Sequence, residues 1–150
     1  MDDRLPGSIL FACDRNGIRS PMAAAIMRHL YGHRVYVDSA GVQTDDTGVD
    51  PFAVAVMAEI GLDIGGHTPK SFDDLVDGSI DLIVSLSPQA HHRAIDLTHT
   101  VSCEVEYWLS LDPTLVEGSR DAILAAYRQL RDDLTARIHR RFPPTGLPQV

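Results

Sequence analysis

The feature that most constrains the fold is a regular alternation of short apolar runs with segments of helical character. Residues 8–12 (SILFA), 34–38 (RVYVD), 80–86 (IDLIVSL) and 100–105 (TVSCEV) have the length and composition of strands. Strands that are apolar on both faces and alternate with helices are typical of a parallel sheet that is covered on both sides. We therefore expect an α/β fold of three layers, with a four-stranded parallel sheet between helices.

The intervening segments carry helix signals. Helices are expected over residues 21–31, from Asp50 to Gly61, as a short segment from about Pro88, and from about Ser119 onward. The last of these presents one apolar stripe, formed by Ile123, Tyr127, Leu130, Leu134 and Ile138. No linker or repeat divides the chain, so we expect one domain over residues 1–150, with 143–150 as a loose tail.

Charge and apolar content exclude several function classes. The formal net charge is −8, and the one basic cluster, RIHRRF, fits the last turns of a helix, so a nucleic-acid partner is not expected. No apolar run approaches the length that spans a bilayer, and the start MDDRLPGS lacks the pattern of an export signal. We expect a cytoplasmic protein with no membrane partner. Its two distant cysteines, Cys13 and Cys103, are expected to be reduced thiols.

One cysteine lies where an α/β fold places its ligands. Cys13 follows the first predicted strand directly, and ligands of parallel sheets bind beyond the carboxyl ends of the strands. Asn16 and Gly17 tolerate the left-handed backbone of a tight turn, whose N–H groups can form an anion-sized nest. Ser20 is expected to cap the next helix, with Pro21 at its first position. The positive end of that helix would then face the same point.

Arg19 completes an anion site around the thiol. Its guanidinium matches two oxygens of a tetrahedral oxyanion. Together with the backbone donors and the helix end it favours a thiolate at Cys13, which is a nucleophile toward bound phosphate. The alternative interpretation, a small core residue at the end of a buried strand, does not explain the turn and the Ser-Pro that follow.

These residues resemble a known family. The run Cys-x5-Arg-Ser-Pro-Met-Ala, from Cys13 to Ala23, is similar to the low-molecular-weight protein tyrosine phosphatases, whose fold thioredoxin-coupled arsenate reductases share. The similarity extends to DSAG (38–41), to GLDIGGHTPKSF (61–72) and to the Asp112-Pro113 pair before the last helix.

The resemblance implies a phosphatase mechanism. Cys13 would form a phosphocysteine, Arg19 would hold the phosphoryl oxygens, and Asp112 would act first as general acid and then as general base. The phosphate-binding loop would comprise Asp14, Arg15, Asn16, Gly17, Ile18 and Ser20. Ser20 would also hydrogen-bond the sulfur, while Asn16, Ser39 and His67 would support the loop.

The resemblance also implies what the site binds. No metal or other cofactor is expected, because arginine and backbone dipoles supply the charge stabilisation. The expected substrate is a phosphotyrosine protein or a small aryl phosphate, and inorganic phosphate, arsenate or vanadate would occupy the same site.

Three departures from the family pattern concern redox protection and specificity. Ile18 stands where the family often has a second cysteine, so we expect no disulfide within the loop. Aromatic residues that would contact a phenyl ring are replaced by Val42–Thr44 and by Thr114-Leu115, and Trp108 and Phe52 are the candidates to compensate. Arg15 replaces a small residue, and either lines the mouth of the site or points to solvent.

Two other function classes remain as alternatives. Arsenate reduction needs further thiols, and the single candidate, Cys103, is expected to be buried in a strand and inert. A non-catalytic anion-binding module would require neither the thiol nor Asp112. The histidines at 91, 92 and 99 do not form a recognisable set of metal ligands.

Overall fold

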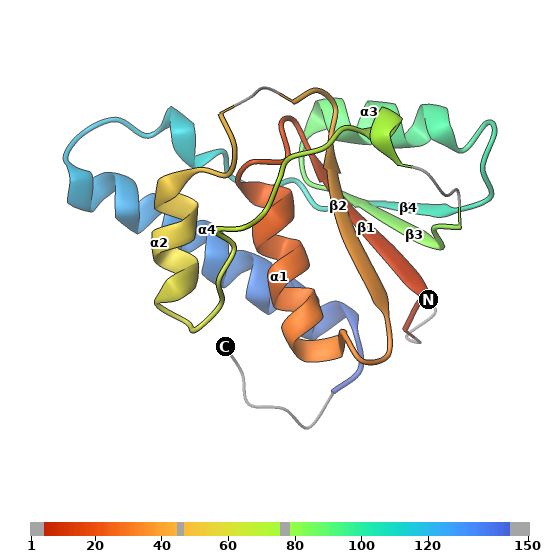
Figure 1. The fold of residues 1–150 in the computed structure, drawn as a ribbon, viewed down its shortest axis with the longest axis horizontal. Helices are drawn as coiled ribbons and strands as arrows, with labels where there is room; N and C mark the ends of the chain where they lie inside the picture. The colour runs from red at the N-terminus through yellow and green to blue at the C-terminus, as the bar shows by residue number, and fades with distance from the viewer. Residues whose placement is uncertain (1–4, 45–46, 76–78, 145–150) are drawn as a thin grey trace.

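A four-stranded parallel sheet organises the fold. The computed structural model describes residues 5–44, 47–75 and 79–144 (Figure 1). The strands in chain order are β1 (Ser8–Cys13), β2 (Tyr36–Gly41), β3 (Leu82–Ser85) and β4 (Glu104–Tyr107). In the sheet they lie in the order β2-β1-β3-β4, and all neighbouring pairs are parallel. The predicted fold class is confirmed.

The position of β1 brings Cys13 to the centre of one sheet edge. All six residues of β1 are buried, because the strand has neighbours on both sides and helices on both faces. Its register pairs Cys13 with Gly41 of β2 and Ala12 with Ser85 of β3. The carboxyl ends of the central strands therefore meet around the thiol.

Four α-helices cover the sheet. They are α1 (Arg19–Tyr31), α2 (Pro51–Ala58), α3 (Pro88–Leu97) and α4 (Arg120–Arg141), with short 3-10 helices η1 (Phe72–Asp74) and η2 (Pro113–Leu115). Helices α1, α2 and α4 lie on one side of the sheet and α3 on the other (Figure 1). Among the described residues, no helix is long and apolar enough to cross a membrane.

Alternate residues of β1 contribute to two cores. Ile9 and Phe11 pack in the larger core with α1, α2 and α4, whereas Leu10 and Ala12 pack in the smaller core with α3. The expected stripe on the last helix is confirmed, since its members pack in or against the larger core. The three-layer arrangement thus follows from a central strand with apolar side chains on both faces.

All four strands have bounds that differ from the predicted ones, and the late starts of β2 and β4 have a local reason. β2 begins at Tyr36 rather than at residue 34, because the N–H groups of 34 and 35 bond to the carbonyl of Tyr31 at the end of α1. β4 begins at Glu104 rather than at residue 100, because the N–H of Thr100 is taken up by a turn after α3. The expectation that Cys103 is buried within a strand is wrong: it precedes β4, an edge strand, and is partly exposed.

The predicted loose tail falls largely outside the described residues. Of its members, Pro143 is held at its carbonyl oxygen by the hydroxyl of Tyr31. The preceding Phe142 is buried and packs edge-on against the ring of Tyr31. The chain is therefore anchored to α1 up to the start of the predicted tail.

Candidate active site

The segment between β1 and α1 curls around the thiol, and its backbone carbonyls point away from the cavity. Four of them accept hydrogen bonds from surrounding segments: Cys13 from Val42, Asp14 from Gln43, Asn16 from His67 and Gly17 from Asp50. Because C=O and N–H point in opposite directions across a trans peptide, bonding these carbonyls outward turns the following N–H groups inward. The loop has the polarity of an anion nest.

The turn itself depends on Asn16 and on the end of β2. Asn16 has a φ of 59°, in the left-handed region that asparagine tolerates better than most residues. A Cβ added to Gly41 would lie 2.7 Å from the carbonyl carbon of Arg15 and 2.8 Å from the nitrogen of Asn16. The loop backbone can therefore approach β2 this closely only because residue 41 is glycine.

A buried polar network holds the turn from below. Asn16 donates from Nδ2 to Ser20 Oγ at 2.8 Å, and its Oδ1 accepts from the N–H of Lys70 at 2.9 Å. His67 Nε2 lies 3.0 Å from the same Oδ1 and 3.1 Å from the Asn16 carbonyl. Burial lowers the pKa of His67, which favours the neutral ring with a proton on Nε2 facing these acceptors.

Ser39 is not part of this network. Its hydroxyl is buried and has no hydrogen-bond partner among the described residues. Asn16 and His67 therefore lie together as expected. Among the described residues, no hydrogen bond from the Ser39 side chain connects it to the loop.

The thiol of Cys13 is buried at the floor of the loop. Its Sγ lies 3.0 Å from Ser20 Oγ and accepts from the Ser20 N–H at 3.4 Å. The Ser20 hydroxyl accepts from Asn16, and its own proton can go to the sulfur or to the more distant carbonyl of Ala40 at 3.5 Å. A backbone donor from the first turn of α1 and a hydroxyl therefore both face Cys13.

This arrangement corrects the predicted start of α1. The helix begins at Arg19, with Ile18 at the N-cap position and no capping side chain. Ser20 is the second helical residue and Pro21 the third, so neither occupies its predicted position. The reason is local, because the Ser20 hydroxyl turns toward the sulfur and Asn16 instead of the backbone of α1.

The guanidinium of Arg19 is held in place by two of its N–H donors, and the others can bind an anion. It is 7% exposed, and it donates from Nη1 to the carbonyl of Ser110 at 3.1 Å and from Nη2 to Asp14 Oδ2 at 3.2 Å. A guanidinium has five N–H donors. Three are not used by these two bonds to described residues, which is enough to grip two oxygens of a bound anion.

The loop forms one wall of a cavity of about 440 Å³. The residues that line it are Cys13, Asp14, Arg15, Gly17, Ile18, Arg19, Thr47, Gly48, Val49, Asp50, Pro51, Asp112 and Thr114. The structure thus brings Asp112 to the same cavity as Cys13 and Arg19, although 99 residues separate it from the thiol. Arg15 is exposed and also lines this cavity.

The carboxylate of Asp112 is oriented by its own turn. Its Oδ1 accepts from the N–H of Thr114 at 3.0 Å and from the Thr114 hydroxyl at 2.6 Å, at the start of η2. The same segment supplies the Ser110 carbonyl that holds Arg19. The segment that carries the carboxylate is therefore tied to the arginine.

Sequence reasoning missed Asp50 as a cavity residue. Asp50 lines the cavity and also caps α2, where it accepts from the N–H groups of Phe52 and Ala53 at 2.7 and 3.3 Å. Its second oxygen accepts from the hydroxyl of Tyr127 at 3.1 Å. Burial, together with the charge of Asp50, raises the pKa of Tyr127, so the phenol stays a donor. An aspartate before a proline indicates the start of a helix, and this pattern does not indicate that the residue also lines a cavity.

The aromatic residues that were candidates to contact a substrate ring lie elsewhere. Trp108 packs against Phe11 and Phe142, with ring centroids 6.0 and 6.4 Å apart. Phe52 packs against Tyr127 at 5.4 Å. Among the described residues, no aromatic side chain lines the cavity of Cys13.

The histidines at 91, 92 and 99 are not among the described residues that line the cavity of Cys13. His91 Nδ1 lies 2.9 Å from Ser85 Oγ, and its ring stacks on Tyr107 at 4.5 Å. Within the part of the chain that the structure describes, no group of three or more acidic, histidine or cysteine side chains could hold a metal ion.

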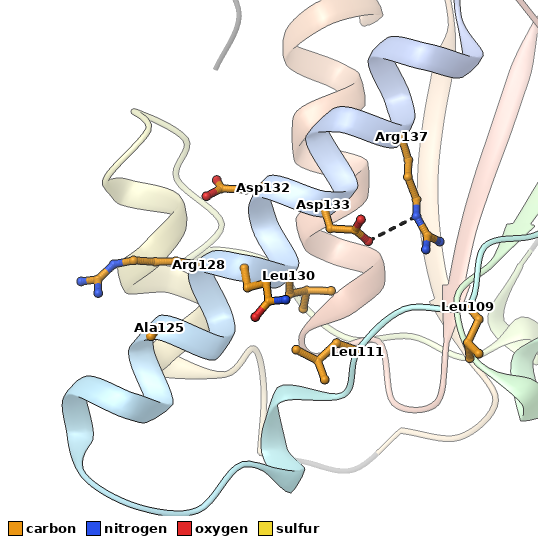
Figure 2. A pocket seen from close by; sticks show the side chains of 9 residues that line it. Leu109, Leu111, Ala125, Arg128, Leu130, Asp132, Asp133 and Arg137 are labelled. Carbon is orange, nitrogen blue, oxygen red and sulfur yellow. Dashed lines mark ion pairs between the residues drawn. The ribbon is translucent and has the colours of Figure 1, made fainter.

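A second, larger cavity of about 740 Å³ lies between α4 and the segment before η2 (Figure 2). Leu109 and Leu111 form its apolar side, and Asp133 and Arg137 pair across 3.2 Å on α4. None of the described residues that line it carries a nucleophilic thiol or hydroxyl. It is therefore not the candidate active site.

Comparison with known proteins identifies the family. A family model for low molecular weight phosphotyrosine protein phosphatases matches residues 8–138. The chain belongs to this family. In this chain, the match spans the sheet, the loop of Cys13 and most of α4.

Several curated relatives of this chain are named arsenate reductases. The arsenate reductase of Halalkalibacterium halodurans is 33% identical, and the match covers 92% of this chain and 96% of that protein. The arsenate reductase of Bacillus subtilis is 30% identical with the same coverage. Among solved structures, an arsenate reductase in the oxidized state has a TM-score of 0.70 at 25% identity, covering 90% of this chain and 95% of that chain.

A further solved structure is that of a YwlE mutant from Bacillus subtilis, with a TM-score of 0.69 at 25% identity, covering 85% of this chain and 90% of that chain. The tyrosine phosphatase AmsI of Erwinia amylovora has a TM-score of 0.68 at 22% identity over 91% of this chain and 94% of that chain, and shows the fold alone. The particular activity of this family member must therefore be argued from its own residues.

Proposed function

We propose that this protein is a cysteine-dependent phosphomonoesterase, with phosphotyrosine proteins or small aryl phosphates as its substrates. The observation that carries the proposal is one cavity that holds the thiol of Cys13, the guanidinium of Arg19 and the carboxylate of Asp112. A nucleophile, an oxyanion clamp and a proton donor are the three groups that phosphate ester hydrolysis requires.

In the first step, the thiolate of Cys13 attacks phosphorus, so that an S–P bond forms as the ester P–O bond breaks. Asp112 gives its proton to the leaving oxygen, and Arg19 and the loop N–H groups stabilise the charge on the phosphoryl oxygens. In the second step, Asp112 takes a proton from water, whose oxygen attacks phosphorus. The S–P bond breaks, and the Ser20 hydroxyl at 3.0 Å stabilises the departing thiolate.

The lining of the cavity bears on the substrate. With no aromatic side chain among the described lining residues, the cavity offers no ring to stack on a phenyl group. We expect phosphotyrosine to be hydrolysed, with a smaller advantage over alkyl phosphates than an aromatic wall would give.

Arsenate reduction is the second candidate, and the curated relatives favour it by name. The position of Cys103 argues against arsenate reduction. Cys103 precedes Glu104, which pairs with Leu82, and Leu82 pairs with Ile9 of β1. Cys103 is thus level with the start of β1, roughly 16 Å along the sheet from Cys13 at about 3.3 Å per residue. A disulfide needs Cα atoms within about 7 Å, so these thiols cannot pair in this fold.

A non-catalytic anion-binding module is the third alternative. Anion binding alone would use Arg19 and the loop N–H groups. It leaves unexplained why a carboxylate and a buried thiol line the same cavity.

Hydrolysis of para-nitrophenyl phosphate by three variants tests the proposal. Turnover should fall by at least about 10³-fold in Cys13→Ser and by about 10²-fold in Asp112→Asn, since each removes a group that acts in the transition state. Cys103→Ser is the matched control and should retain activity. Unchanged rates in Cys13→Ser would reject the proposal, whereas arsenate-dependent oxidation of a dithiol that is lost in Cys103→Ser would favour the reductase.

A further inference from the structure

Asp14 places a carboxylate inside the proposed phosphate-binding loop. It follows Cys13 directly and lines the same cavity. Its Oδ2 accepts from Nη2 of Arg19 at 3.2 Å, and the pair also forms a salt bridge. The acidic side chain is therefore in direct contact with the group that would grip the substrate anion.

The opposite side of the Asp14 carboxylate is bound to the start of α3. Ser87 donates from Oγ to Asp14 Oδ1 at 2.6 Å, and the same hydroxyl caps α3 by accepting from the N–H of Ala90 at 3.2 Å. In the amide orientation that satisfies its neighbours, Gln89 donates to both carboxylate oxygens, at 2.8 and 3.0 Å. Asp14 thus joins Arg19 to a helix 73 residues away from the loop.

The guanidinium is consequently held by two different segments. Asp14 takes a hydrogen from Nη2, while the carbonyl of Ser110 takes one from Nη1. A guanidinium on a flexible stem that is held at both terminal nitrogens loses little further freedom when an anion binds. This contact pre-orients Arg19 before substrate arrives.

The same carboxylate acts against bound phosphate through its charge. A negative group that shares the cavity with a dianion raises the free energy of the complex, and it offsets part of the positive charge of Arg19. The side chain of Asp14 is 36% exposed, so solvent weakens this repulsion without removing it. Weaker binding of the product phosphate would speed its release.

We propose that Asp14 is a positioning residue that orients Arg19 through α3 and lowers the affinity of the loop for phosphate. The inference rests on the proposed function, because it takes the loop of Cys13 as the phosphate site. It assigns opposite effects to one side chain, since orientation favours catalysis while charge opposes anion binding.

Asp14→Asn separates the two effects. The amide keeps an acceptor for Arg19 or Ser87 but loses the charge, so the Kd for inorganic phosphate, measured by calorimetry, should fall by about tenfold. The kcat for para-nitrophenyl phosphate should stay above that of Asp14→Ala, because the amide oxygen can still accept from Arg19. Asp14→Ala should bind phosphate tightly as well, with kcat lower by about tenfold because Arg19 is no longer held.

Asp73→Asn is the matched control. Asp73 is an exposed carboxylate that pairs with Arg93 away from the cavity, so the substitution makes the same charge change without altering the Kd for phosphate. An unchanged Kd in Asp14→Asn, or an equal fall in Asp73→Asn, would overturn the inference. Tighter phosphate binding in Asp14→Asn, if wild type hydrolysed no ester, would reject the proposed function and still support the role of Asp14.

Discussion

Asn16 shows how much a single residue can contribute to the site. Its backbone supplies the left-handed turn with φ at 59°, and its buried side chain bonds to Ser20 and to the N–H of Lys70. The sequence predicted a left-handed turn at Asn16 or Gly17, and Asn16 alone of the two adopts it. The side-chain contacts could not be predicted from the pattern of the loop, because Lys70 lies 54 residues away.

Two substitutions separate the backbone from the side chain of Asn16. Asn16→Gly removes the hydrogen bonds but keeps the left-handed turn, so the free energy of unfolding should fall by about 2–3 kcal/mol. Asn16→Ala also imposes the cost of a left-handed alanine, so its loss should exceed that of Asn16→Gly by about 1 kcal/mol. Urea denaturation measures both variants. Equal losses would contradict the conformational part of this account.

At the scale of elements, the site depends on how β2 ends beside the loop. Strand positions were predictable because apolar runs mark buried strands, and the errors fall at strand ends, where turns after α1 and α3 take up backbone N–H groups. The register that pairs Cys13 with Gly41 was not predictable from either strand alone. It is this pairing that brings the loop backbone against residue 41.

Gly41→Ala tests the close approach of β2 to the loop. The new methyl group would meet the backbone of Arg15 and Asn16, so the loop must shift. We expect a loss of about 1–3 kcal/mol in the free energy of unfolding and a fall in ester hydrolysis of more than about tenfold.

Gly66→Ala is the control for this substitution, because a Cβ at residue 66 meets no atom within 4 Å. It should leave both the stability and the rate nearly unchanged. Similar effects of the two substitutions would show that the loop does not depend on a glycine at position 41.

At the scale of the whole molecule, the fold separates the two thiols. Cys13 ends the central strand, whereas Cys103 precedes an edge strand at the opposite end of the sheet. The α/β class was predictable from the alternation of strands and helices. The choice between phosphatase and reductase was not, because it depends on which thiols the tertiary structure brings together.

Mild peroxide treatment tests this separation. We expect peroxide to oxidise Cys13 to sulfenic acid and then irreversibly to sulfinic or sulfonic acid. No intramolecular disulfide to Cys103 should form, and no closer thiol is at hand, because Ile18 stands where the family often has a second cysteine. Peptide mass spectrometry without reduction identifies the products. Under the same peroxide treatment, Cys103→Ser should be inactivated as fast as the wild-type protein. A Cys13–Cys103 bond within one chain would contradict the proposed arrangement.

The central claim is that Cys13 carries the phosphoryl group during turnover. The most direct measurement is acid quenching of Asp112→Asn during reaction with para-nitrophenyl phosphate, followed by mass spectrometry of the peptide that contains Cys13. The account predicts the added mass of one phosphoryl group on Cys13, and its absence in Cys13→Ser. Turnover by wild type with the phosphoryl group on another residue, or with none trapped on the protein, would contradict the account.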